Sequence, residues 1–120
     1  MIDKALMADI LNSFKDPLVF VDTQHIIRYM NTAAIQHYNE GANLLNRSVF
    51  TCHNNQSKEM IRSVFSAFQA GEVERLITDD EKHRIYMRAV RDEGGQLIGY
   101  YERYEPPSTM TTLKEQNQSK

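Results

Sequence analysis

The first hydrophobic residues of the chain recur every four positions. Four positions advance an α-helix by slightly more than one turn, so residues with this spacing fall on one stripe of its surface. The stripe consists of Ile2, Leu6, Ile10 and Phe14. Lys15-Asp16-Pro17 ends the pattern, because the residue before a proline disfavours helical backbone. The pattern predicts an amphipathic helix over residues 1–15.

Two short runs rich in β-branched and aromatic residues come next. LVFVD (18–22) and IIRYM (26–30) are separated by a few polar residues, a pattern that predicts a hairpin of two antiparallel strands. Asn31 then precedes TAAIQHYN (32–39), where an asparagine side chain can accept a hydrogen bond from the first turn of a helix. We therefore expect Asn31 to cap a short helix.

A broad apolar face marks the longest predicted helix. The face consists of Met60, Ile61, Val64, Phe65 and Phe68. An asparagine at position 54 or 55 would start this helix, and Gly71 closes it. Residues 40–55 have poor periodicity, so we expect turns there and one short helical piece around Leu44 to Phe50.

After Gly71 the hydrophobic period changes to two. Three runs alternate in this way: VERLIT (73–78), HRIYMRAVR (83–91) and QLIGYYERY (96–104). Acidic and glycine-containing turns separate the runs, which predicts a meander of three antiparallel strands. In the middle run only the face of Ile85, Met87 and Ala89 is apolar throughout, so we expect that face to be buried.

The expected elements follow the order helix, two strands, helices, three strands. A five-stranded antiparallel sheet with helices packed on one face satisfies this order, which describes an α+β fold. Residues 106–120 begin with two prolines and continue as a polar run, which predicts a flexible tail.

Length and composition narrow the class of protein. At 120 residues the chain fits one domain that can build its own core. The net charge of -2 offers no basic surface for a nucleic-acid backbone, and no apolar run is long enough to span a bilayer. One cysteine permits no internal disulfide, and the acidic start lacks the basic segment of a secretion signal. We expect a cytoplasmic protein that binds neither nucleic acid nor membrane.

The sequence resembles a PAS domain over roughly residues 11–104. DPLVFVDTQHIIRYMNTAA (16–34) is similar to the family's first strand, turn and second strand, and DEGGQLIGYYERY (92–104) is similar to its final hairpin. VFTCHNNQS (49–57) is similar to a segment of one PAS subgroup, in which Phe-x-x-Cys-His and a later Ser lead into the long helix. Asn54 and Asn55 depart from that subgroup, which often has prolines there.

The resemblance implies a PAS fold with strand order 2-1-5-4-3 and a pocket between the sheet and the helices. It also implies three segments, with residues 1–15 as a dimerisation and signal helix, 16–105 as the PAS domain and 106–120 as the tail. PAS domains act as sensors and dimerisation modules, and some hold haem, flavin or a small organic acid whereas others hold nothing. The residues expected to bind a ligand are Asn31, Tyr38, Cys52, His53, Met60, Val64 and Met87.

Cys52 and His53 are the strongest candidates for chemistry. Neighbouring side chains usually diverge, which is poor geometry for a nucleophile and its base, and no second cysteine is available for a zinc site. Haem remains open, because one axial ligand suffices and His53 could supply it. A structural role also remains open, in which His53 braces the helix start and Cys52 fills core space. Flavin is disfavoured, because TCHNNQ lacks the Arg-Phe-Leu run of the light-sensing subgroup.

Three functions follow as hypotheses. The leading one is a stand-alone PAS sensor that binds a small molecule or a partner protein and signals through dimer contacts to a separate signalling protein. The alternatives are a haem-binding gas or redox sensor with His53 as axial ligand, and a ligand-free dimerisation scaffold. No residues converge as acid, base and nucleophile, so we expect no enzyme. We expect a homodimer through Ile2, Leu6, Ile10 and the outer sheet face.

Overall fold

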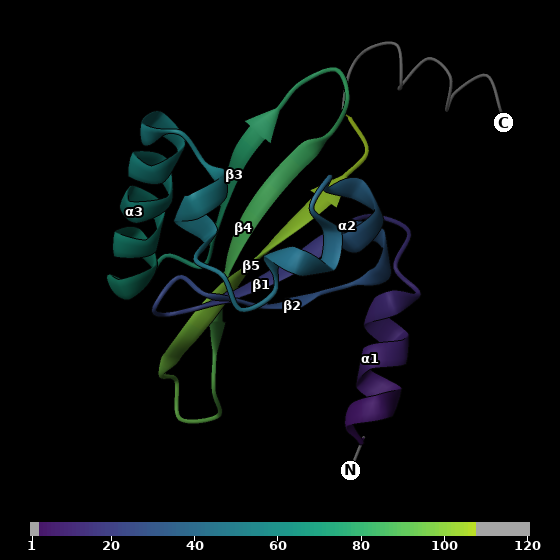
Figure 1. Ribbon diagram of the computed structural model, residues 1–120. Coiled ribbons are helices and arrows are strands. Elements are labelled where there is room, and N and C mark those ends of the chain that lie inside the picture. Colours follow the sequence, from purple (N-terminus) through teal and green to yellow (C-terminus); the bar gives the residue numbers. More distant parts are fainter. Residues whose placement is uncertain (1–2, 108–120) are drawn as a thin grey trace, which may run out of the picture.

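Five antiparallel strands form one sheet in the computed structural model, which describes residues 3–107 (Figure 1). From one edge to the other, the strand order is β2-β1-β5-β4-β3. This order and the helices beside the sheet confirm the predicted α+β architecture. The strands are β1 (Leu18–Asp22), β2 (Ile27–Met30), β3 (Glu74–Asp79), β4 (Arg84–Arg91) and β5 (Leu97–Glu105).

Two helices begin directly after asparagines that the sequence indicates as caps. Asn31 Oδ1 accepts a hydrogen bond from the Ala34 N–H at 2.9 Å, and Asn54 Oδ1 accepts one from the Ser57 N–H at 2.8 Å. Each bond satisfies a backbone donor that the first helical turn leaves free, so both predicted caps are confirmed. Within residues 3–107 the α-helices are α1 (Lys4–Asn12), α2 (Thr32–His37) and α3 (Asn55–Gln69).

The segment between α2 and α3 differs from its prediction. Instead of one helical piece around Leu44 to Phe50, it forms two 3₁₀ helices, η1 (Gly41–Leu44) and η2 (Val49–Cys52). Between them the Asn46 N–H donates to the Ile27 carbonyl at 2.8 Å. The Ile27 N–H donates in turn to the carbonyl of Arg47 at 2.9 Å. These bonds hold the chain against β2, so a continuous helix cannot form there.

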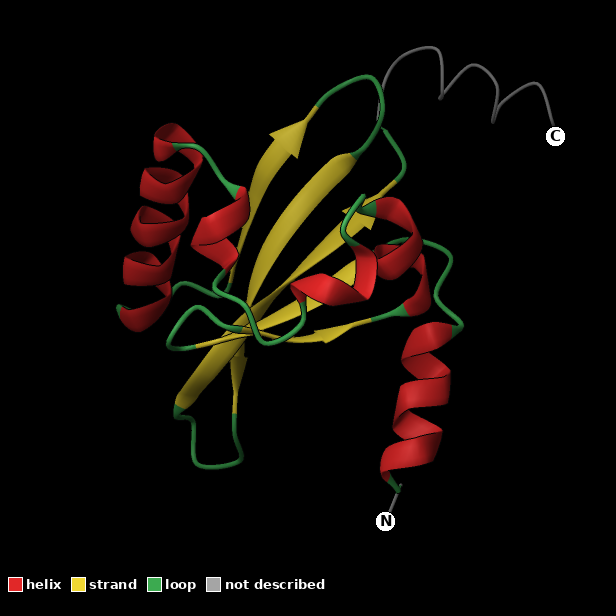
Figure 2. Ribbon diagram, viewed as in Figure 1, coloured by secondary structure: helices red, strands yellow, loops and turns green. Residues whose placement is uncertain are grey.

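The hydrophobic core lies on one side of the sheet. Figure 2 shows α2, α3 and the 3₁₀ helices on that side. Burying a large apolar side chain contributes about 1.5–3 kcal/mol, so this cluster holds the covering segments on the strands. The buried apolar residues are Val19, Val21, Ile27, Met30, Ala34, Leu44, Val49, Ile61, Val64, Phe68, Met87 and Tyr100.

Helix α1 stands apart from this core and projects away from the sheet (Figure 1). None of its residues is buried, and Leu6 and Ile10 remain 48% and 45% exposed. The predicted N-terminal helix is therefore present with an apolar side that its own domain leaves uncovered. Ile2 and residues 108–120 of the predicted tail lie outside the described residues. Within residues 3–107, no helix is long and apolar enough to cross a bilayer.

Candidate functional site

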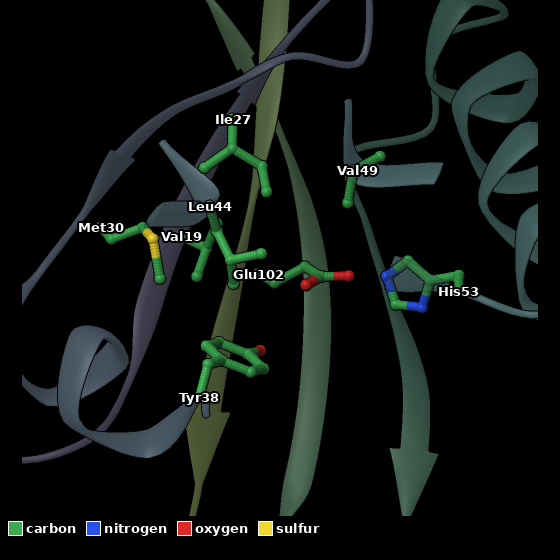
Figure 3. Close-up of a pocket in the computed structure, with 8 residues that line it drawn as sticks. All are labelled: Val19, Ile27, Met30, Tyr38, Leu44, Val49, His53 and Glu102. Atoms are coloured by element: carbon green, nitrogen blue, oxygen red, sulfur yellow. The ribbon is translucent and has the colours of Figure 1, made fainter. Parts of the chain in front are cut away.

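A cavity of about 100 Å³ lies between the sheet and the segments that cover it (Figure 3). Strands β1, β2 and β5 contribute one side, and the end of α2, η1, η2 and the residue after η2 contribute the other. Of the described side chains that line the cavity, five are apolar and three are polar. The lining residues are Val19, Ile27, Met30, Tyr38, Leu44, Val49, His53 and Glu102.

Glu102 points into this cavity from the centre of the sheet. The alternation of β5 places it on the inner face together with Tyr100 and Tyr104, and its cross-strand neighbours are Val19 on β1 and Met87 on β4. Its exposed fraction is only 7%. Burial raises the pKa of the Glu102 carboxyl to about 7, because a low-dielectric surrounding disfavours the charged form.

No residue in the described part of the chain forms a hydrogen bond or ion pair with the Glu102 carboxyl. The nearest arginines along β4 and β5 face the other side of the sheet, where Arg88 and Arg103 both contact Glu74 and Arg103 also contacts Glu105. A buried carboxylate without a partner is costly. Glu102 is therefore partly protonated near neutral pH, or it becomes charged when a positive group enters the cavity.

His53 faces Glu102 from the covering side of the cavity. It follows η2 with extended backbone, at φ -126° and ψ 149°, and the next residue, Asn54, caps α3. Figure 3 shows the imidazole and the Glu102 carboxyl turned toward each other. Burial lowers the pKa of His53, so the ring is neutral at pH 7. A neutral imidazole accepts one hydrogen bond and donates another, which suits it to contact a polar ligand.

Tyr38 supplies the third polar side chain of the cavity. It is the C-cap residue of α2, and its hydroxyl lies 2.7 Å from the Tyr104 hydroxyl. Burial raises the pKa of Tyr104, although the hydrogen bond with Tyr38 acts in the opposite direction. Tyr104 is therefore uncharged near pH 7, and the two phenols form a neutral polar end of the site.

Two of the seven residues predicted to bind a ligand, His53 and Tyr38, line this cavity. Asn31 is fully buried, but its side chain serves the backbone: Oδ1 accepts from Leu18 and Ala34, and Nδ2 donates to two carbonyl oxygens. It has no remaining hydrogen-bonding capacity for a ligand, so its place in the fold is that of a structural brace.

Three other predicted residues, Met60, Val64 and Met87, are not among the described residues that line the cavity. Val64 and Met87 are buried in the core, and Met60 packs against the core while partly buried. Cys52 is the last residue of η2. A ligand contact for any of these residues stays a prediction.

Glu102 is the site residue that the sequence reasoning missed. In LIGYYERYE the period of two places Glu102 on the same face as Tyr100 and Tyr104, whereas Arg103 falls on the opposite face. A carboxyl group on the inward face of a strand was the available signal. The neighbouring Arg103 hides this signal, because an adjacent glutamate and arginine are typical of a solvent-exposed ion pair.

Haem does not fit this cavity. Sites for drug-sized ligands occupy about 300–1,000 Å³, several times the roughly 100 Å³ present here, and a porphyrin is itself of drug size. The cavity side of His53 also faces the Glu102 carboxyl (Figure 3). Among the side chains that the structure describes, no three from His, Cys, Asp or Glu group in a way that could hold a metal ion. We therefore derive no step through haem or a metal.

Comparison with known proteins places these observations in a family. A family model described as a PAS domain matches residues 7–105. None of the curated proteins compared with this chain matches it.

Several solved structures share the fold. A C-terminal domain from Streptococcus mutans is 20% identical, with a TM-score of 0.77, and the match covers 93% of this chain and 90% of that one. The PAS domain of a protein from Colwellia psychrerythraea is 20% identical, with a TM-score of 0.64 and coverages of 85% and 94%. The Aer2 receptor from Vibrio cholerae, described as a dual PAS-heme oxygen sensor, is 21% identical, with a TM-score of 0.58 and coverages of 77% and 94%. At such identities these matches show the fold alone.

Proposed function

This chain belongs to the PAS domain family, because the family model spans most of it, and we propose that it is a sensor module. In this proposal the cavity between the sheet and its covering segments binds a small molecule. The Glu102 carboxyl carries the proposal, because it is buried, points into a cavity and has no partner within residues 3–107. Among the described residues no fully enclosed side-chain oxygen or nitrogen lacks a partner, so the Glu102 oxygens open onto the cavity, where a group that enters it can reach them. A ligand that supplies the missing partner explains why such a group is tolerated.

Strand β5 offers a route by which occupancy could reach the outer face of the sheet. Glu102 faces the cavity, and the preceding residue, Tyr101, lies in an apolar groove of about 470 Å³ on the other face. Leu11, near the end of α1, and Phe14, two residues beyond the helix, border the same groove. A ligand that bonds to the Glu102 carboxyl therefore contacts β5, the strand whose other face lies against the end of α1.

We further propose that a second copy of the chain covers α1 and this groove. The apolar side of α1 is exposed, and the groove beside it is lined by apolar and aromatic side chains. Helices with an uncovered apolar face usually bury it in an interface. Such a dimer would pass the signal to a separate protein. A cytoplasmic location, which the single cysteine favours, stays a prediction.

Leu6→Glu is expected to convert a dimer into monomers. The substitution places a carboxylate in the middle of the exposed apolar side of α1, where burial in an interface would be costly. Sedimentation velocity at micromolar protein concentration measures the change. Lys4→Glu is the matched control, because it adds a carboxylate to the same helix at an exposed polar position and should leave the dimer intact. A wild-type monomer, or a dimer that persists in Leu6→Glu, contradicts the proposed interface.

Leu44→Trp is expected to abolish ligand binding. Leu44 lines the cavity from η1, so the larger indole fills space that a ligand would occupy, at a stability cost of about 1–3 kcal/mol from overpacking. Ligand-observed NMR with a library of fragments of up to six non-hydrogen atoms detects binding to the wild type and its loss in the variant. Leu76→Trp is the matched control, because Leu76 is exposed on β3.

These outcomes separate the proposal from its alternative. A protein that binds none of the fragments but dimerises through α1 is a ligand-free scaffold. Fragment binding that survives in Leu44→Trp places the ligand outside the cavity and contradicts the proposed site.

A further inference from the structure

The proposed ligand site has a distinct polarity, with one charged group among apolar walls. We propose that the cavity selects small primary amines, an inference that rests on the proposed ligand-binding function. The ammonium group lies between the Glu102 carboxylate and the His53 imidazole, and the hydrocarbon part lies against the apolar wall formed by residues such as Val19, Met30 and Leu44.

The charge of the cavity favours a cation. Among the described residues that line the cavity, Glu102 is the only acid, and none is a lysine or an arginine. Its neighbours in register, Val19 and Met87, are apolar. A ligand carboxylate would therefore meet a like charge or force Glu102 to remain protonated, whereas an ammonium group supplies the missing ion pair.

His53 complements this charge as a hydrogen-bond acceptor. No described side chain bonds its ring, and its depressed pKa keeps it neutral, so one ring nitrogen is available to accept. An ammonium group has three donors, which Glu102 and His53 together can satisfy. The hydroxyl of Tyr38, the third polar group of the cavity, forms a hydrogen bond with the Tyr104 hydroxyl.

The volume of the cavity limits the size of the amine. A cavity of 150 Å³ is known to hold benzene, with six non-hydrogen atoms, so about 100 Å³ has room for roughly four. The same space would hold about three waters at roughly 30 Å³ each. Propylammonium, with four non-hydrogen atoms, is therefore a suitable probe, and binding in the roughly millimolar range is expected for so few contacts.

The protonation of Glu102 gives amine binding a pH signature. The titratable groups that face Glu102 are His53 and Tyr38 from the covering segments, with Tyr100 and Tyr104 on its own strand. Propylammonium stays charged from pH 6 to pH 8, whereas Glu102, with a pKa of about 7, changes from mainly neutral to mainly ionised. Burial lowers the pKa of His53, so its ring is neutral at pH 8 and does not oppose a cation there.

The test is an NMR titration of the backbone amides near the cavity with three probes of the same length: propylammonium, 1-propanol and propionate. At pH 8 we expect propylammonium to bind about tenfold more tightly than 1-propanol, and propionate not to bind. The wild type should bind propylammonium about tenfold more weakly at pH 6 than at pH 8, since the ionised fraction of Glu102 falls by that factor.

Glu102→Gln removes the charge and keeps the shape of the side chain, so this variant should bind propylammonium no better than 1-propanol. Glu93→Gln is the control, because Glu93 lies at an exposed turn and its variant should bind the three probes as the wild type does. The pH comparison uses only the wild type, so the proposal stays testable if Glu102→Gln does not fold. Equal binding of propylammonium and 1-propanol, or equal affinity at pH 6 and pH 8, overturns amine selectivity and leaves a ligand site. Failure of all three probes overturns the amine proposal, and the fragment library then decides separately whether the cavity binds any small molecule.

Discussion

Replacing Glu102 by glutamine stabilises the protein relative to wild type by about 3 kcal/mol more at pH 8 than at pH 4.5. In the unfolded chain this carboxyl titrates near 4.5, and burial raises its pKa in the folded protein to about 7. The neutral Glu102 carboxyl contributes fully to the free energy of unfolding when the pH is below its pKa in the unfolded chain. The protein loses this contribution as the pH rises through the pKa of Glu102 in the folded state. Glutamine stays neutral throughout, so it does not lose this contribution.

Urea denaturation of both proteins at a series of pH values measures the effect. The readout is the difference in the free energy of unfolding between variant and wild type, because the other carboxyl groups titrate alike in both. Any constant cost of burying the amide then cancels between the two pH values. Glu93→Gln, at an exposed turn, should show a difference that does not depend on pH. A pH-independent difference for Glu102→Gln would mean that this carboxyl is solvated or paired.

Replacing Asn31 by alanine lowers the free energy of unfolding by about 4 kcal/mol. The Asn31 amide makes four hydrogen bonds to backbone groups: from the N–H groups of Leu18 and Ala34 at 3.0 and 2.9 Å, and to the carbonyls of Leu11 and Asp16 at 3.2 and 3.1 Å. The side chain is fully buried, so alanine leaves these groups without partners and without easy access to water. The start of β1, the cap of α2 and the end of α1 lose their common brace.

Chemical denaturation at pH 7 checks this value. Asn31→Asp keeps both acceptor bonds and loses the two donor bonds, so its destabilisation should be intermediate. Asn39→Ala is the matched control, because Asn39 is exposed in the turn after α2 and should change the stability by less than about 0.5 kcal/mol. A loss below about 1 kcal/mol in Asn31→Ala would show that the four bonds do not hold these segments together.

The fold could be predicted because its signals are local. The apolar face of α3 recurs at helical spacing, and its capping residue Asn54 lies directly before it. The strands after Gly71 alternate with a period of two, which fixes their faces. The single helical piece predicted around Leu44 to Phe50 was wrong because this segment depends on a distant contact. The backbone N–H of Asn46 bonds Ile27, in a hairpin nearly twenty residues earlier.

The site could be predicted only in part, because a cavity depends on tertiary packing. The sequence indicates that His53 precedes the long helix, but its direction follows from the extended backbone between η2 and α3. Asn31 is a second example, since the sequence does not reveal that its amide bonds backbone groups of four other residues. The burial of Glu102 depends on Val19 and Met87, which lie beside it on neighbouring strands but far from it in the sequence.

The carbon-13 resonance of the Glu102 carboxyl, followed against pH in glutamate-labelled protein, tests most directly whether a buried carboxyl without a partner faces the proposed ligand site. Glu102→Gln assigns the signal by its loss. The expected midpoint lies near pH 7, and saturating propylammonium should move it to lower pH, because the bound cation favours the ionised form. A midpoint near 4.5 that the amine does not move would contradict both the burial of Glu102 and its place in a binding site.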